Sequence, residues 1–238
     1  MKVLCLVPTL PEDLDSECLP SINRQTCPVS HVALVTQRVR GGFLCERVSY
    51  VLNKALERFD LQSYDYLLRV DGDTVLPINF IRQGILADCD LYGTIGFAML
   101  IKVKPFMDCM NGRFCSFDDD TYVGHCFRTY GYTVLAADLS KVKTRRISHP
   151  LSFYLNKGAT YYRIGYTFQN FVANIKPRQP AVSIFLLGGF ILALLGRKPK
   201  SEFACKIWSQ QLMGLAKLLS RQKIKLLLQG ISQRFSSQ

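Results

Sequence analysis

Several familiar features are missing from this sequence, and each absence narrows the possibilities. Its nine cysteines include no C-x-x-C pair, so a zinc site is not expected. An odd number of cysteines in a chain of 238 residues indicates reduced, buried thiols, as in a cytosolic protein. There is no internal repeat or low-complexity segment, and the apolar start Met1–Pro8 is too short for a signal peptide. We expect one large domain, or a domain with a small appendage.

Acidic residues are nearly missing from the end of the chain. From Lys176 onward there are eleven Lys and Arg residues and a single acid, Glu202, whereas residues 1–175 hold nineteen basic and seventeen acidic residues. The net charge of +12 is therefore concentrated in the tail. This distribution does not indicate a nucleic-acid surface across the protein. It indicates local attraction to an anionic lipid surface or another polyanion.

One stretch, Tyr64–Phe80, carries the strongest chemical signal. It begins with an apolar run, Tyr66–Val70, that is typical of a buried strand, and continues as Asp71-Gly72-Asp73. Two carboxylates at positions i and i+2 lie on the same side of an extended backbone. Paired hard oxygen ligands after a buried strand suit Mg²⁺ or Mn²⁺ that holds a diphosphate. A D-x-D triplet alone also occurs as solvated loop acids or helix caps, so that alternative stays open.

The order of predicted elements indicates an α/β fold. Strands are expected at 2–9, 32–36 and 66–70, and they alternate with helices at 14–25 and 43–59. This alternation predicts a mostly parallel sheet with helices on both faces. Further along, a strand is expected at 98–103, a helix after the acids Asp118–Asp120, and a strand at 132–136. Acids at a helix start are often only caps, so Asp119 and Asp120 have that alternative reading.

These residues together resemble family 2 glycosyltransferases of the GT-A fold. The resemblance covers most of 2–135 and rests on six features in the family's order. They are the first strand ending in Pro8-Thr9, the segment Ser21–Pro28, the N-x-A helix at Asn53, the D-x-D stretch 64–80, the strand 97–101, and Asp119-Asp120 followed by Gly131-Tyr132.

The resemblance implies a Rossmann-like catalytic domain over 1–150 and an enzyme that moves a sugar from a nucleotide-diphosphate donor to an acceptor hydroxyl, with inversion. It implies donor contacts at Pro8, Thr9, Asn53 and Asp71. The Mg²⁺ or Mn²⁺ ligands would be Asp71, Asp73 and His149, although a lone histidine is more often structural. Asp120 is the expected general base, with Asp119 as its catalytic neighbour.

Three departures limit what the resemblance implies. The family usually has an acidic pair after the second strand, where this chain has Val35-Thr36-Gln37, which leaves the nucleotide open. Asp119 is shorter than the family's glutamate, and no Q-x-x-R-W motif occurs, which argues against a processive polymer synthase. Two alternatives also stay open. One is a haloacid-dehalogenase-like phosphatase using Asp71 and Asp73, and the other is a non-catalytic module that binds sugar nucleotides.

The C-terminal extension, 151–238, is expected to be helical, aromatic and basic. Its segment 181–195 is uncharged and mostly apolar, and as a helix it would be about 22 Å long, short of the roughly 30 Å of a bilayer core. Segment 207–231 mixes apolar and basic residues, as helices in the headgroup region do. We expect peripheral or monotopic attachment to the cytoplasmic face of the membrane, beside a lipid-linked acceptor or a surface polysaccharide precursor. The alternative is a hairpin buried in the core.

Overall fold

The computed structural model shows two compact units, 1–153 and 154–238. Unit 1 is an α/β domain, and unit 2 is helical. The residues that the structure describes are 1–39, 43–94, 97–116, 118–138, 142–144, 149–175, 180–198, 200–201, 204–209, 211–213 and 216. Most of the predicted helix at 207–231 lies outside these residues.

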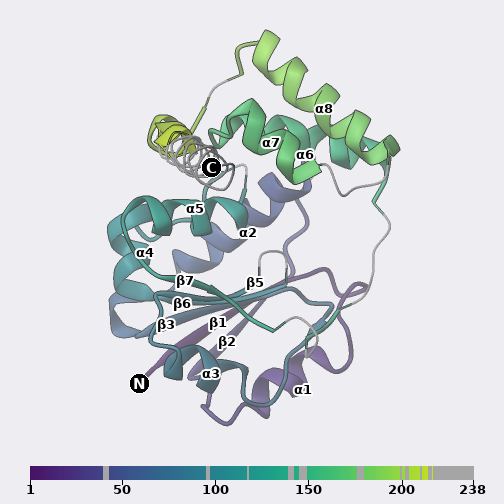
Figure 1. The fold of residues 1–238 in the computed structure, drawn as a ribbon. Helices are drawn as coiled ribbons and strands as arrows, with labels where there is room; N and C mark the ends of the chain where they lie inside the picture. The colour runs from purple at the N-terminus through teal and green to yellow at the C-terminus, as the bar shows by residue number, and fades with distance from the viewer. Residues whose placement is uncertain are drawn as a thin grey trace, which may run out of the picture. The chain divides into compact units, whose positions relative to one another are not determined.

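The centre of unit 1 is a six-stranded sheet in the order β2-β1-β3-β6-β5-β7 (Figure 1). Strand β1 pairs in parallel with both β2 and β3, and β5 pairs in parallel with β7. The strands are β1 (Val3–Pro8), β2 (His31–Val35), β3 (Tyr66–Val70), β5 (Leu91–Thr94), β6 (Ala98–Lys102) and β7 (Val134–Ala136). The mostly parallel α/β sheet that the sequence predicts is confirmed.

Strand β6 is the exception, because it runs antiparallel to both β3 and β5. The connection from Thr94 at the end of β5 to Ala98 at the start of β6 is too short for a parallel crossover, which needs a dozen or more residues. The sequence pattern did not predict β5. Its four residues, Leu91–Thr94, include a glycine, Gly93, whose φ is +141°. A glycine within so short a segment weakens the strand signal in the sequence.

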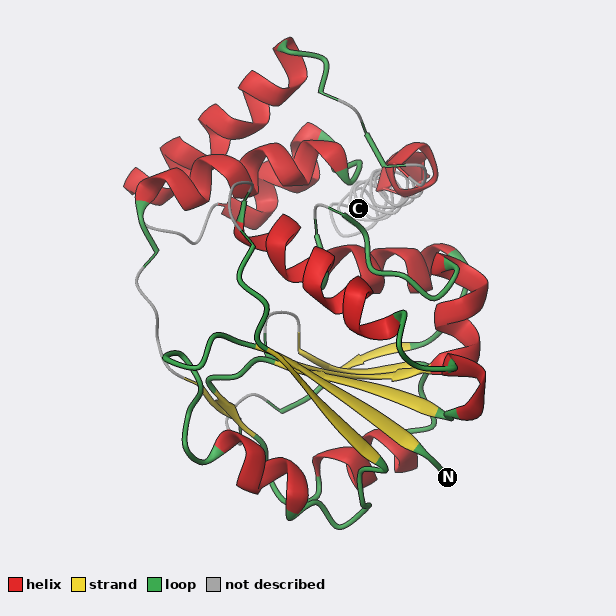
Figure 2. Cartoon of the chain, turned by 180° about the vertical axis from the view of Figure 1, so that it is seen from behind, coloured by secondary structure: helices red, strands yellow, loops and turns green. Residues whose placement is uncertain are grey.

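Helices cover both faces of the sheet, as Figures 1 and 2 show. One face carries α1 (Cys18–Asn23) and α3 (Phe80–Leu86), and the other carries α2 (Leu44–Leu56), α4 (Val103–Met110) and α5 (Thr121–Thr129). On the α1 and α3 side, Val3, Cys5 and Val7 of β1 form one core cluster with Leu68 and Val70 of β3. Burial of alternate strand residues on each face fixes the register.

Residues of β3 that alternate with this cluster point to the opposite face. They are Leu67, which is fully buried, and Arg69, which is only 3 % exposed. The register places Arg69 between Leu6 of β1 and Met99 of β6, and both of these side chains are fully buried. The sheet therefore contains an arginine within an apolar layer, where a charge needs partners.

A small second sheet forms beside the D-x-D segment. Strand β4 (Thr74–Val75) pairs antiparallel with β8 (Lys143–Thr144), with Thr74 opposite Thr144. The pairing brings a late part of unit 1 to the residues that follow Asp73. Neither strand was predicted from the sequence, because two-residue strands carry no periodic signal.

Unit 2 contains α7 (Phe168–Ile175), α8 (Pro180–Leu195) and most of α6 (Leu151–Arg163), with further helical residues at 204–209 and 211–213. The predicted segment 181–195 is indeed a helix. Phe190 of α8 stacks on Phe171 of α7, with ring centroids 4.4 Å apart. Within the described part of the chain, no helix has both the length and the apolar character required to cross a membrane.

Candidate functional site

The D-x-D segment follows β3 and lies against the loop that follows β1. A Cβ on Gly72 would overlap the side chain of Thr9, so only glycine allows the two loops to approach this closely. The backbone N–H of Asp15 donates to the carbonyl of Gly72 at 2.8 Å, and the N–H of Asp71 donates to Phe97 at 2.9 Å. Three chain segments therefore meet at the carboxyl end of the parallel strands, where ligands of open α/β sheets bind.

Arg69 is the charged centre of this strand end. Its Nη2 lies 2.9 Å from Oδ1 of Asp71 and 2.6 Å from Oδ2 of Asp119, which is fifty residues away in sequence. The Arg69 and Asp119 side chains are 4 % and 6 % exposed, whereas that of Asp71 is 26 % exposed. The guanidinium therefore holds one carboxylate inside the protein and another at the surface of the site.

The acids around Arg69 influence one another strongly. Burial and the nearby charges of Asp119, Asp120 and Asp73 raise the pKa of Asp71 to about 7, even though Arg69 acts in the opposite direction. Burial and two further acids, Asp13 and Asp15, raise the pKa of Asp73, while a side-chain hydrogen bond with Thr144 opposes the rise. Negative charge is thus gathered beyond what Arg69 balances, and such a cluster attracts a cation.

The three acids before α5 have distinct positions. Oδ1 of Asp118 accepts a hydrogen bond from the N–H of Tyr122 at 3.0 Å, and the Asp120 carboxylate accepts one from the N–H of Thr121. Both bonds satisfy N–H groups at the helix start, as the capping alternative predicts. Asp119 instead turns into the core toward Arg69. Its burial favours a positioning role, whereas the half-buried Asp120 keeps a surface from which an acceptor can be reached.

The donor set fits a divalent cation that is shared with a substrate. Asp71 and Asp73 supply hard carboxylate oxygens on either side of Gly72, and both side chains are partly exposed. Among the described residues, no group of three or more His, Cys, Asp and Glu side chains is arranged to hold a metal ion. Mg²⁺ commonly uses one or two carboxylates together with substrate phosphates and water, so two protein ligands are compatible with that chemistry.

Three other predicted site residues lie as follows. Pro8 is the buried last residue of β1, and Thr9 follows it against Gly72, beside the acids. The ring of His149 stacks on Phe153 with centroids 4.0 Å apart, and burial lowers its pKa. The lower pKa keeps the imidazole neutral, the form that binds a metal. The predicted roles of these residues remain predictions.

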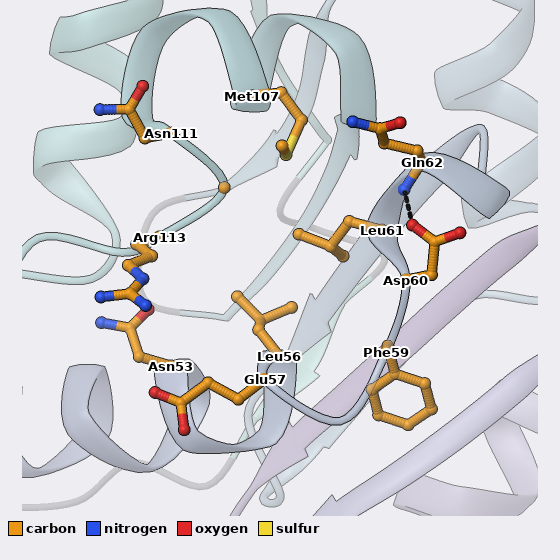
Figure 3. A pocket seen from close by; sticks show the side chains of 11 residues that line it. Asn53, Leu56, Glu57, Phe59, Asp60, Leu61, Gln62, Met107, Asn111 and Arg113 are labelled. Carbon is orange, nitrogen blue, oxygen red and sulfur yellow. Dashed lines mark hydrogen bonds between the residues drawn. The ribbon is translucent and has the colours of Figure 1, made fainter.

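Asn53 has a structural contact that the sequence did not reveal. Its amide nitrogen donates to the Phe114 carbonyl at 2.9 Å, and its oxygen accepts from the Phe114 N–H at 2.8 Å. It also lines a pocket of about 220 Å³ formed by α2, α4 and a short 3₁₀ helix, Leu61–Ser63, that precedes β3 (Figure 3). The lining includes Leu61 and Gln62, which precede β3 in the chain, whereas Asp71 follows the end of that strand. The contacts favour a structural role for Asn53 over the predicted nucleotide contact.

Arg69 was not among the site residues predicted from the sequence. The signal was present, because an arginine inside an otherwise apolar strand must be paired or solvated. The sequence did not reveal that Asp119 is its partner, because the two residues are fifty positions apart.

No family model and no curated protein sequence matches the chain.

Comparison with solved structures establishes the fold class. The mannosyltransferase PcManGT from Pyrobaculum calidifontis, in complex with GDP-Man and Mn²⁺, aligns with 90 % of this chain and 80 % of its own at a TM-score of 0.53 and 15 % identity. S. aureus TarS 1–349 in complex with UDP-GlcNAc aligns with 87 % of this chain and 78 % of its own, at a TM-score of 0.48 and 13 % identity. The first alignment shows that this chain shares the α/β fold of that mannosyltransferase.

Proposed function

We propose that the protein is a glycosyltransferase that uses a nucleotide-diphosphate sugar and Mg²⁺ or Mn²⁺. The observation that carries the proposal is the contact of Arg69 with both Asp71 and Asp119, because it joins the D-x-D segment and the acids before α5 into one site. The fold shared with PcManGT, whose complex contains GDP-Man and Mn²⁺, supports it. The proposal covers the class of donor and the type of reaction, and it names no particular sugar, nucleotide base or acceptor.

In the proposed reaction, Asp71 and Asp73 would hold the cation, and a bound cation would supply positive charge that stabilises the leaving diphosphate. Asp120 accepts the proton of the acceptor hydroxyl. The acceptor oxygen forms a bond to the anomeric carbon while the bond from that carbon to the diphosphate oxygen breaks, and the diphosphate leaves with the electron pair. A single displacement of this kind inverts the anomeric centre.

Arg69 acts in this scheme as a positioning residue. It touches Asp71 from inside the sheet and leaves that carboxylate 26 % exposed toward the site. Its Nη2 makes the contacts to both acids, and within the part of the chain that the structure describes Nε and Nη1 are buried without a hydrogen-bond partner. Because one guanidinium contacts both carboxylates, it couples the position of the proposed metal ligand Asp71 to that of Asp119, which precedes α5.

A thermal-shift experiment tests the proposal directly. The full-length protein is heated with a panel of GDP-, UDP- and other nucleotide sugars, with and without Mn²⁺ or Mg²⁺. We expect a rise in Tm that requires both a nucleotide sugar and a metal, because ligands that bind the folded state stabilise it. Release of nucleoside diphosphate in the same mixtures then measures turnover.

The matched variants are Asp73→Asn, which removes a proposed metal ligand, and Asp88→Asn, which changes a side chain that is 93 % exposed after α3. Only the first should abolish the shift. The proposal is wrong if no nucleotide sugar raises Tm with either metal. Metal-dependent hydrolysis of a generic phosphate ester, without any response to nucleotide sugars, would instead support the phosphatase alternative.

A further inference from the structure

Helix α8 leaves large apolar side chains on the protein surface. Its sixteen residues, Pro180–Leu195, include no charged residue. Five aliphatic side chains of α8 are 38–74 % exposed: Ile184, Ile191, Leu192, Leu194 and Leu195. An apolar surface of this extent on one helix is typical of an interaction site.

The exposed and buried residues of α8 occupy opposite sides of the helix. At about 100° per residue, Ile184, Ile191 and Leu195 form one stripe, with Leu192 and Leu194 on its two flanks. Leu186, Gly189, Phe190 and Ala193 are buried and form the facing stripe. A helix that is apolar on both sides but covered on only one side has room for a second apolar neighbour.

Packing within unit 2 fixes which side of α8 stays open. A Cβ on Gly189 would overlap the carbonyl of Leu155, and a Cβ on Gly158 would overlap the carbonyl of Leu186. The backbones of α6 and α8 are therefore in direct contact at two glycines. Phe190 adds a stacked contact with Phe171 of α7. Since this side of α8 is held by protein, the opposite side is presented as a fixed apolar face.

Cations follow the apolar face immediately. Arg197, Lys198 and Lys200 are exposed, and Lys200 lies 4.9 Å from the ring centroid of Tyr162. Residues 154–238 contain thirteen Lys and Arg residues and one acid. A protein partner for such a region would need a matching excess of acids, whereas an anionic bilayer supplies negative charge and an apolar interior side by side.

We propose that the exposed face of α8, with Arg197, Lys198 and Lys200, is a docking surface for an anionic lipid bilayer. Helix α8 lies in the plane of the membrane, with its aliphatic stripe toward the acyl chains and its glycine side on α6. The cations lie at the level of the lipid phosphates. This inference does not depend on glycosyl transfer, because it rests on unit 2 and the proposed reaction on unit 1.

Flotation of the full-length protein with vesicles tests the inference. The vesicles are phosphatidylcholine with or without phosphatidylglycerol, at low and high salt. We expect flotation with the anionic vesicles and a weaker interaction as salt increases. The double variant Leu192→Gln/Leu195→Gln should lower the partition coefficient roughly 100-fold, as expected from the transfer free energy of two leucines. The triple variant Arg197→Gln/Lys198→Gln/Lys200→Gln should lower it about as much on anionic vesicles alone.

Matched variants in unit 1 test whether vesicle binding depends on where the substituted residues lie or only on their residue types. Ile78→Gln/Leu86→Gln alters aliphatic side chains that are 60 % and 73 % exposed, close to the 60 % and 74 % of Leu192 and Leu195. The triple variant Arg58→Gln/Lys104→Gln/Arg82→Gln removes three exposed cations from unit 1. Both control variants should float like the unaltered protein.

Three results would overturn the inference. The unaltered protein could stay at the bottom of the gradient with anionic vesicles, or the unit 1 variants could reduce flotation as much as the unit 2 variants. Light scattering could instead show self-association that the Leu192→Gln/Leu195→Gln change abolishes, with no flotation, in which case the face binds a second copy of the chain. Circular dichroism confirms that each variant is folded.

Discussion

The two units of this protein differ most in how they handle charge. Residues 1–153 contain seventeen basic and seventeen acidic residues, so their formal charge is zero, whereas residues 154–238 carry the whole net charge of +12. Unit 1 brings opposite charges into contact, as at Arg69 with Asp71 and Asp119. Unit 2 leaves its cations beside exposed leucines. The net positive charge of the chain therefore belongs to unit 2, and it is not a property of the unit that contains the candidate site.

The units also use glycine differently. Gly72 of unit 1 allows two loops to meet at the proposed site, whereas Gly158 and Gly189 of unit 2 allow two helices to touch along their backbones. The first contact positions polar groups, and the second leaves an apolar face open. In our two proposals unit 1 carries out the chemistry and unit 2 provides attachment, and each of the following predictions tests that division.

The largest effect is expected from removing both carboxylates of the D-x-D segment. Asp71→Asn/Asp73→Asn should abolish metal-dependent nucleotide-sugar binding, measured by calorimetry, and leave vesicle flotation unchanged. In the unaltered protein the metal affinity should rise as pH increases through about 7, because the pKa of Asp71 is raised to about 7 and a bound proton competes with the metal below it. Loss of flotation in the variant would contradict this division, because vesicle binding would then depend on unit 1.

The next effect distinguishes two neighbours within unit 1. Asp120→Asn should lower turnover by roughly two to four orders of magnitude, the usual contribution of a general base, with little change in donor affinity. Asp119→Asn should instead lower the free energy of unfolding, because it leaves the buried Arg69 with one acid fewer. Steady-state kinetics and urea unfolding measure the two quantities. A catalytically dead Asp119→Asn beside an active Asp120→Asn would reverse the roles.

A third variant tests how much unit 1 depends on its buried cation. Arg69→Met should destabilise unit 1 by about 3–5 kcal/mol, because two acids lose their shared partner in a buried setting. Labelling of the fully buried Cys5 thiol during urea unfolding, quantified on the peptide that contains Cys5, reports on unit 1. Trp208, the single tryptophan, reports on unit 2 by fluorescence. If the tryptophan transition shifts as much as the thiol transition, the units do not unfold separately.

The smallest effect compares two adjacent glycines of α8. Gly189→Ala should destabilise unit 2 by about 1–3 kcal/mol, because its new methyl group would overlap the Leu155 backbone. Gly188→Ala should be neutral or stabilising by about 0.5–1 kcal/mol, since its methyl group would lie 3.5 Å from the Leu155 side chain and alanine favours the helix. Tryptophan fluorescence during urea unfolding measures both. Equal effects would show that α6 and α8 do not pack through Gly189.

Local patterns in the sequence predicted much of unit 1. The apolar run 66–70 is β3 with the same limits, and the amphipathic pattern of 43–59 gives α2 at Leu44–Leu56. Such patterns could not predict that β6 runs antiparallel or that β4 pairs with β8, because both features depend on contacts between distant segments. The same holds at the site, where the acids were identified from sequence but Arg69, which binds two of them, was not.

The contact between Arg69 and Asp119 also has a consequence for when the sheet folds during synthesis of the chain. A chain emerging from the ribosome presents Arg69 fifty residues before the acid that completes its pairing. Until then, the arginine has only Asp71 as a partner, and burial of β3 between β1 and β6 is opposed by an incompletely paired charge. The sheet should therefore close late, after α5 has been synthesised. Nascent chains halted before residue 119 should be sensitive to protease, and chains halted after α5 should resist it.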